Sequence, residues 1–272
     1  MTALTSAAET SIQQGDLEGA LVQLQESVRD DPGNASLRIF LFQLLAVTGN
    51  WKRALTQLNV AADMDGTALL MGQTYRELLH CENYRTSVFA GERAPLMMGE
   101  PPAWMAKLIQ ALPLSASGDG AGARALVDAA FEQAETRKGT IDGVPFEWVS
   151  DSDMRLGPVL EAIINGKYYW IPLDNIAKLT ISAPDDLRDL VWIPVEFTWT
   201  NGGESIGFLP SRYAGEKTLS DPQTALARKT EWQDLGGDFY IGAGQKTLST
   251  DVDEYPLLQV NNIVFETSDK AD

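Results

Sequence analysis

Apolar residues recur every three to four positions through the first part of the chain, a period that places them on one face of an α-helix. The first two such faces consist of Leu4, Ala8 and Ile12, and of Leu17, Leu21, Leu24 and Val28. They predict a first pair of helices. A second pair is expected over residues 35–48 and 51–63, with Asn34 as its N-cap.

The pattern continues less regularly after residue 66. A long helix is expected to begin near Thr67, and its apolar positions are Leu70, Tyr75, Leu78 and Leu79. Residues 91–102 are interrupted by prolines and are interpreted as a loop. A further helical pair is expected from about Pro102, because Gly118 and Asp119 precede Ala123 and Phe131.

Two of these pairs are copies of one unit. The string GDLEGAL at residues 15–21 recurs 34 residues later as GNWKRAL at residues 49–55, and 34 residues is the period of the tetratricopeptide repeat. In that unit a Gly ends the first helix and a small Ala lets the two helices approach closely. Such repeats stack into a curved surface that holds a peptide or a helix. The pattern therefore indicates a binding protein.

After Gly139 the pattern changes to the alternation that is typical of strands. Strands are expected at residues 146–149, 168–171, 178–182, 191–200, 204–209, 238–241 and 260–266. Residues 156–164 are expected to form a short helix that ends at Asn165 and Gly166. Pro194 predicts an edge strand or a bulge in the 191–200 strand.

The expected fold class is α+β. An all-α, tetratricopeptide-like helical domain is predicted over residues 1–139, and a mixed, mainly antiparallel β-rich domain over residues 140–272.

Composition and charge narrow the possible partners. The net charge of the 272 residues is −17, and residues 140–272 carry 22 acidic against 10 basic side chains. An anionic membrane or a nucleic acid would repel such a chain. The single cysteine excludes an internal disulfide and a multi-cysteine zinc site. No segment approaches the ~20 apolar residues of a membrane span, and no signal peptide is evident, so the cytoplasm is the expected location.

Four groups of residues suggest chemistry, and a structural explanation is preferred for each. Residues 242–247 (GAGQKT) lack the Gly that a phosphate loop needs before its Lys-Thr pair, so a flexible turn is expected. Asp151 and Asp153 are too few for a divalent metal site, and Asp153 is expected to cap the 156–164 helix. No metal and no cofactor is therefore expected.

The remaining two groups are interpreted in the same way. His80 and Cys81 are neighbours on a helix and point about 100° apart, so they cannot act as a nucleophile pair, and Cys81 is expected in the core. Tyr168 and Trp170 should share the buried face of a strand, with Tyr169 on the opposite face. No catalytic residue is identified.

Six strings of residues resemble the ImpE family, also called TagJ or SciE, of type VI secretion accessory proteins. They are SVFAGER (87–93), GEPPAW (99–104), IDGVPFEW (141–148), DMRLGPVLE (153–161), NGKYYWIP (165–172) and DLRDLVW (186–192). The resemblance implies a bacterial cytoplasmic, non-enzymatic adaptor. Its implied partners are an N-terminal helix of the small contractile-sheath subunit and, directly or indirectly, the ClpV-type ATPase that disassembles the sheath.

The binding surface is expected on the first helix of each repeat, because these helices line the concave face of a tetratricopeptide array. The corresponding positions are Glu9 and Ile12 in the first unit, Ile39, Gln43 and Ala46 in the second, and Gln73, Glu77 and His80 in the third. These side chains could instead pack against the C-terminal domain. A second function class also stays open, in which the β-rich domain is a small-ligand sensor or an enzyme and the repeats recruit it.

Overall fold

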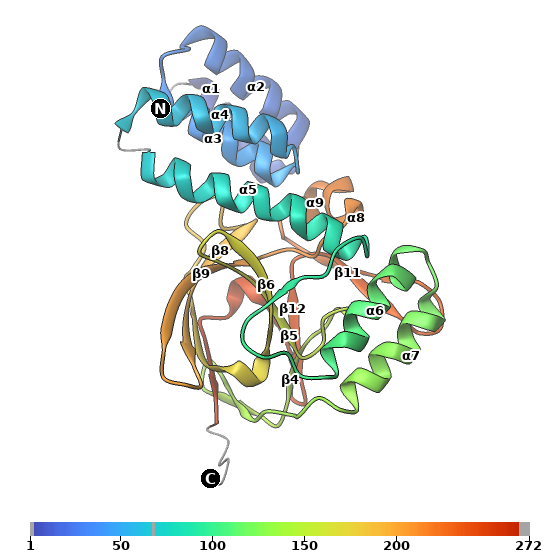
Figure 1. The fold of residues 1–272 in the computed structure, drawn as a ribbon. Helices are drawn as coiled ribbons and strands as arrows, with labels where there is room; N and C mark the ends of the chain where they lie inside the picture. Colours follow the sequence, from blue (N-terminus) through green and yellow to red (C-terminus); the bar gives the residue numbers. More distant parts are fainter. Residues whose placement is uncertain (1–2, 67–68, 267–272) are drawn as a thin grey trace.

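The computed structural model describes residues 3–66 and 69–266, so the expected helix start at Thr67 lies outside the described residues. Its first part consists of helices (Figure 1). The pairs are α1 (Ala3–Gln14) with α2 (Leu17–Asp30), and α3 (Ala35–Val47) with α4 (Trp51–Met64). The long α5 (Leu69–Phe89) follows, and then the pair α6 (Met105–Ala116) and α7 (Gly120–Phe131). The predicted order of helices is confirmed.

The turns within the pairs explain why the repeat motif begins with Gly. Gly15, Gly49 and Gly118 have φ values of +82°, +69° and +83°, in the left-handed region that a residue without a Cβ adopts readily. Asp16 and Asp119 follow two of these glycines, and their side chains accept hydrogen bonds from the N–H groups of α2 and α7. The side chain of Asn34 caps α3 in the same way, as predicted.

A nine-stranded sheet dominates the second part of the chain. Its strands lie in the order β1 (Leu96–Met97), β6 (Lys167–Pro172), β5 (Val159–Ile164), β9 (Glu204–Pro210), β8 (Trp192–Trp199), β7 (Ile176–Ile181), β14 (Asn262–Phe265), β2 (Gly139–Ile141) and β3 (Val144–Phe146). Neighbouring strands are antiparallel except for β1 and β6. The expected mixed, mainly antiparallel region is therefore present.

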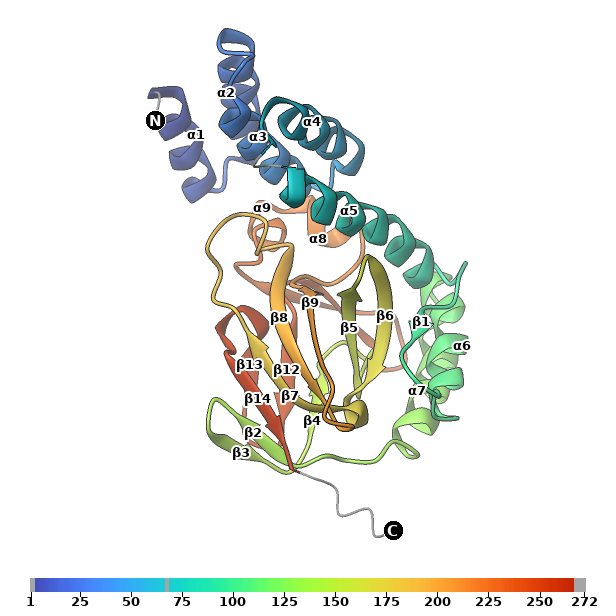
Figure 2. The ribbon, with the colours of Figure 1, turned by 60° about the vertical axis from the view of Figure 1, so that its left-hand side comes forward.

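Two smaller sheets complete this region. One contains β13 (Glu254–Pro256), β12 (Thr247–Thr250) and β4 (Val149–Asp151), and the other contains β10 (Thr230–Asp234) and β11 (Tyr240–Gly244). Two short helices, α8 (Glu216–Ser220) and α9 (Pro222–Ala225), lie beneath the N-terminal repeats in Figure 2. Two 3₁₀ turns, Leu173–Asn175 and Leu257–Gln259, follow β6 and β13.

The expected helix over residues 156–164 is wrong, because Val159–Ile164 forms strand β5. Every residue of β5 is buried. Val159 and Ile163 belong to one hydrophobic core and Leu160, Ala162 and Ile164 to a second, so the strand is covered on both faces. Burial on both faces removes the alternation of apolar and polar residues, and Glu161, the one charged residue of β5, is itself buried. Asn165 and Gly166 have φ values of +50° and +69°, which makes them the turn of the β5–β6 hairpin and not the end of a helix.

The role expected for Pro194 is also wrong, since β8 lies between β7 and β9 and is not an edge strand. The irregularity in the β7–β8 pairing lies instead near Ile176, at the other end of the strand. The Pro194 carbonyl accepts a hydrogen bond from Ser182, just beyond β7. The last residue pair between β7 and β8 is Ile181 with Val195, so the missing N–H of Pro194 falls at the end of the β7–β8 ladder.

Four smaller expectations need correction. The 91–102 loop contains β1, which adds to the edge of the large sheet. Residues 146–149 are divided between β3 and β4, and the 238–241 strand is β11, shifted to Tyr240–Gly244. Residues 242–247 are buried and run from β11 into β12, so they are not a flexible turn.

The sheet separates two cores. The first core joins side chains of α1 to α7 to one face of the sheet, including Tyr168 and Trp170. The second core contains the opposite face and side chains from β2, β3, β12 and β14, and Tyr169 packs against it. The predicted alternation of the three aromatic residues is confirmed. The proposed division into domains at residues 139 and 140 stays a prediction, because the first core is built from both sides of it.

Candidate functional site

A groove lies between the first helices of the two repeats and a segment of the β-rich region. Its volume is about 550 Å³. Helices α1 and α3 form one side, and residues 184–190, between β7 and β8, form the other. The lining residues are Glu9, Ile12, Gln13, Phe40, Gln43, Pro184, Asp185, Asp186, Leu187 and Leu190. We call this feature the repeat groove.

Local hydrogen bonds hold the β-side wall of the repeat groove in place. The Asp189 carboxylate accepts the N–H groups of Asp185 and Asp186, at 2.7 and 3.1 Å. Asp186 pairs with Arg188, whose guanidinium lies 4.7 Å from the centre of the Tyr75 ring on α5. Asp186 also accepts a hydrogen bond of 3.3 Å from Gln43 on α3. The wall is therefore attached to the repeats and is not a loose loop.

The predicted binding residues of the first two repeats have different locations. Glu9, Ile12 and Gln43 line the repeat groove. Ile39 is half-buried on α3 and is not among the lining residues, whereas its neighbour Phe40 is. Ala46 has no exposed surface, so its side chain cannot contact a guest.

The predicted residues of the third unit do not continue the repeat groove. Gln73, Glu77 and His80 are exposed on α5. Glu77 lines a separate cavity of about 200 Å³, together with the β5–β6 turn and Ile206 of β9. Ile206 is 73% exposed. The sequence did not identify Ile206 as a candidate, because the alternation within β9 does not reveal that this side chain lies beside α5.

A second feature, the buried charge cluster, lies where α5 meets the sheet. Its members are Glu82, Arg85, Asp151, Asp153, Arg155, Glu161 and Lys246. Arg85 Nε and Nη2 donate to the two oxygens of Glu161 at 2.6 and 3.1 Å. Lys246 Nζ lies 2.6 Å from Glu161 and 2.7 Å from Asp151. Arg155 makes a similar two-bond contact with Asp153.

Hydroxyl and indole groups complete the coordination of these charges. Tyr168 donates to Glu161 at 2.6 Å, and Trp170 donates to the Tyr168 hydroxyl at 2.7 Å. Tyr213 donates to Asp151, and Trp192 donates to Glu82, each at 2.9 Å. Within the described residues, no buried side-chain nitrogen or oxygen lacks a hydrogen-bond partner.

Burial and pairing shift the pKa values of the cluster in opposite directions. For Glu161, burial opposes ionisation, but the charges of Arg85 and Lys246 outweigh it and hold its pKa well below the ordinary value. For Asp151, burial dominates over the attraction of Lys246, and its pKa is raised. The pKa of Lys246 is raised, since the charges of Asp151 and Glu161 outweigh its burial. Attraction between opposite charges therefore keeps Glu161 and Lys246 ionised in spite of their burial.

Arg212 connects the β-rich region to the repeats. Its guanidinium donates to the Val47 carbonyl at 2.7 Å and also to the Ala225 carbonyl, at the C-terminal ends of α3 and α9. A cation is favourable there, because the carbonyl end of a helix carries partial negative charge. Burial lowers the pKa of Arg212 to about 10, which leaves it charged at neutral pH.

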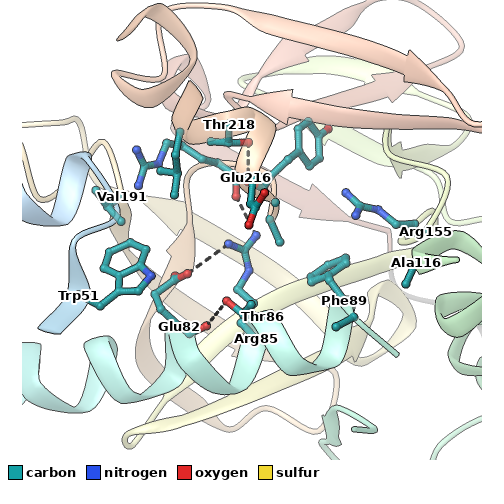
Figure 3. A pocket seen from close by; sticks show the side chains of 16 residues that line it. Trp51, Glu82, Arg85, Thr86, Phe89, Ala116, Arg155, Val191, Glu216 and Thr218 are labelled. Atoms are coloured by element: carbon teal, nitrogen blue, oxygen red, sulfur yellow. Dashed lines mark hydrogen bonds and ion pairs between the residues drawn. The ribbon is translucent and has the colours of Figure 1, made fainter. Parts of the chain in front are cut away.

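A cavity of about 620 Å³ borders the buried charge cluster. Figure 3 shows Glu82, Arg85 and Phe89 of α5 on one side of it and Glu216 and Thr218 on the other. Of the charged side chains that line it, Glu82, Arg85 and Arg155 are each in an ion pair. The pair between Arg85 of α5 and Glu161 of β5 stabilises the junction between α5 and the sheet.

The other residues considered for chemistry have structural roles. Burial raises the pKa of the Cys81 thiol to about 12, so the thiol stays protonated, and its sulfur lies 3.3 Å from the Gly166 carbonyl. Asp153 does not cap a helix, contrary to expectation, because Val159–Ile164 forms strand β5, and its carboxylate pairs with Arg155 instead. In the part of the chain that the structure describes, no three His, Cys, Asp or Glu side chains are placed to hold a metal. None of the helices between residues 3 and 266, omitting 67 and 68, is long and apolar enough to cross a membrane.

Known proteins resemble both regions of this chain. A family model described as ImpE protein matches residues 143–264, and a tetratricopeptide repeat model matches residues 11–70. The type VI secretion system accessory component TagJ of Pseudomonas aeruginosa is 48% identical over 262 residues, which cover 96% of this chain and 92% of TagJ. A crystal structure of a Vibrio parahaemolyticus protein has a TM-score of 0.87 and 26% identity, and the match covers 96% of this chain and 97% of that one. The repeats and the β-rich region therefore occur together in these relatives.

Proposed function

The chain belongs to the ImpE family, and from this premise we propose that it is a non-enzymatic adaptor of a bacterial type VI secretion system. In this role its repeats bind an N-terminal helix of the small sheath subunit. The bound protein links the sheath to its ClpV-type disassembly ATPase, directly or through a further component. Such an adaptor acts in the cytoplasm, where the sheath assembles.

The repeat groove is the observation that carries this proposal. Concave, largely apolar surfaces between helices are common binding sites for an amphipathic helix. Ile12 and Phe40 supply apolar contacts from the repeats, and Leu187 and Leu190 supply them from the opposite wall. The identity with a type VI secretion accessory component extends over the repeats that form one wall and the segment that forms the other.

The chemistry of the buried groups supports an adaptor without catalysis. Glu82, Arg85 and Arg155, which line the cavity of about 620 Å³, are each in an ion pair, and the Cys81 thiol is protonated. Pure protein should therefore hydrolyse neither ATP nor model esters above a buffer blank. This part of the proposal would be contradicted if the pure protein hydrolysed either substrate and a single substitution in the buried charge cluster abolished the hydrolysis without unfolding the protein.

The binding role is tested by calorimetric titration of the full chain with the purified small sheath subunit and with a synthetic peptide of its N-terminal helix. Both should bind, with micromolar or weaker affinity for the peptide, because a partial interface of this kind loses much of its gain to ordering. A truncated subunit without that helix should not bind. Failure of the intact subunit to bind at concentrations well above micromolar would overturn the proposed partner.

A small-ligand sensor is the second candidate, and the cavity of about 620 Å³ is the observation that favours it. Its volume falls in the range of typical ligand sites. The test is a thermal-shift screen with carboxylate and phosphate metabolites. A saturable shift that Arg155→Gln removes would support a sensor, since Arg155 lines the cavity. No shift, at concentrations up to millimolar, would favour the adaptor alone.

A further inference from the structure

The geometry points to a composite docking surface whose guest is a basic amphipathic helix. This inference rests on the proposed function and deepens it in two ways. It names the chemistry of the guest, and it makes residues 184–190 of the β-rich region half of the site.

The floor of the repeat groove is apolar on both sides. Ile12 is 6% exposed and forms the floor on α1, and Phe40 on α3 is partly buried beside it. Leu187 and Leu190 face them from the other wall and are also partly buried. A guest that covers this floor removes apolar surface of both regions from water, which is the favourable term in such an association.

The rim of the repeat groove is acidic. Glu9 on α1 and Asp185 on the opposite wall are both exposed. Among the contacts of the described residues, neither carboxylate has a hydrogen bond or an ion pair. The two walls thus offer one uncompensated carboxylate each, and a cationic guest can pair with both.

Two basic groups that contact lining residues of the groove, Arg188 and Arg228, do not neutralise this rim. Arg188 is paired with Asp186 and lies against the Tyr75 ring. Arg228 donates to the backbone carbonyls of Ile12 and Gln13 at the end of α1 and does not line the groove. The net charge of −17 adds a long-range attraction for a basic partner.

A helical guest fits this surface better than an extended one. One wall consists of the helices α1 and α3. In the other wall, the Asp189 carboxylate already accepts the N–H groups of Asp185 and Asp186, so neither wall offers a strand edge to the groove. An extended peptide would leave its backbone groups without partners, whereas a helix satisfies them internally. The guest is therefore a helix with an apolar stripe flanked by Lys or Arg.

The first experiment compares two synthetic 16-residue helices with the same Leu and Ala stripe, one flanked by Lys and the other by Glu. The full chain should bind the Lys helix at least tenfold more tightly at low salt, and the difference should shrink as the ionic strength rises. Equal affinities, or tighter binding of the Glu helix, would overturn the basic guest.

The second experiment reverses the rim charges. Glu9→Lys combined with Asp185→Lys should weaken binding of the Lys helix by roughly ten- to a hundredfold, because two attractive contacts become repulsive. The matched control is Glu26→Lys with Asp63→Lys, which changes the net charge equally at exposed positions of α2 and α4. Circular dichroism monitors folding. An equal loss in both double variants would reduce the effect to net charge and contradict the site.

The single variants test whether the surface is composite. Glu9→Lys and Asp185→Lys should each weaken binding of the Lys helix about three- to tenfold. If only Glu9→Lys has an effect, the repeats alone form the site and the composite surface is wrong.

The failure of this inference can be told apart from the failure of the proposed function. A small sheath subunit that binds the parent chain and the rim variants equally would keep the proposed partner and reject the rim. Binding of the Lys helix, without binding of the sheath subunit, would keep the basic docking surface and reject the partner.

Discussion

The N-terminal repeats and the β-rich region are stabilised by different kinds of interaction. The cores of α1 to α4 consist of small and large apolar side chains such as Ala20, Leu24, Ala54 and Leu58, all completely buried. The β-rich region adds to its apolar core a cluster of buried ion pairs centred on Glu161. Apolar packing of stacked helices tolerates an open surface such as the repeat groove, whereas buried charges need a closed environment with fixed partners.

Helix α5 shows how the two kinds of stabilisation meet. By sequence it continues the repeats, yet its buried face carries Glu82 and Arg85, which belong to the charge cluster of the sheet. The wall of the repeat groove formed by residues 184–190 thus belongs to the β-rich region and not to the repeats. A change in the sheet can therefore alter binding at the repeats without touching a repeat residue.

The largest effect is expected from Glu161→Gln, which keeps the side-chain size and removes the charge. It leaves Arg85 and Lys246 without their shared carboxylate, and breaking a buried pair costs about 3–5 kcal/mol. The measurement is the free energy of unfolding in urea. Glu77→Gln, the same change at an exposed position of α5, is the control and should cost less than about 0.5 kcal/mol. Similar losses in the two variants would show that the cluster does not stabilise the fold.

A core truncation in the repeats tests whether the two regions unfold together. Leu58→Ala removes a completely buried side chain of α4 and should cost about 3 kcal/mol. Because one core joins the repeats to the sheet, tryptophan fluorescence and far-ultraviolet circular dichroism should shift to the same lower urea midpoint. Two separate midpoints would show that the repeats unfold independently of the sheet.

Acid should weaken the β-rich region through Glu161. Its folded-state pKa is held below the ordinary value of 4.5, so the stabilisation is complete above that pH and is lost as the pH falls toward the lower value. Asp151 acts with the opposite sign, since its raised pKa makes proton uptake favourable to the folded state, and this gain is complete below 3.8.

The net prediction is a loss of unfolding free energy in the parent chain below about pH 4.5, a loss that Glu161→Gln reduces. The measurement is a series of urea titrations between pH 7 and pH 2.5. Identical slopes for both proteins would assign the acid sensitivity to other carboxylates.

The smallest effect concerns the helix caps within the repeats. The Asp16 side chain accepts a hydrogen bond of 2.8 Å from Gly19 in the first turn of α2, whereas Asn50, at the corresponding position of the second repeat, makes no side-chain cap bond. Asp16→Ala should cost about 1 kcal/mol and Asn50→Ala less than about 0.5 kcal/mol. Thermal or urea unfolding resolves this difference. Equal costs would mean that the cap bond of Asp16 contributes nothing.

The helical half was predictable because its signals are local. The Gly of each repeat turn, the cap at Asn34 and the apolar period all lie within a few residues of the element they specify. The strands bounded by alternation, such as β6 and β9, were predictable for the same reason. The Asn165–Gly166 pair was also a local hairpin signal, but the apolar run before it was interpreted as a helix.

What the sequence could not reveal depends on contacts between distant segments. The repeat positions Glu9, Ile12 and Gln43 were identified from the period, but the opposite wall, residues 184–190, lies more than 140 positions away from Gln43. The charge cluster joins Arg85 to Glu161 and Lys246 to Asp151 across separations of 76 and 95 positions. Backbone propensity and periodicity act within a few turns of chain, so the sequence alone determined the helices and many of the strands. Only the tertiary structure decided which charges are buried together and which residues face the groove, because those outcomes follow from the packing of whole elements against one another.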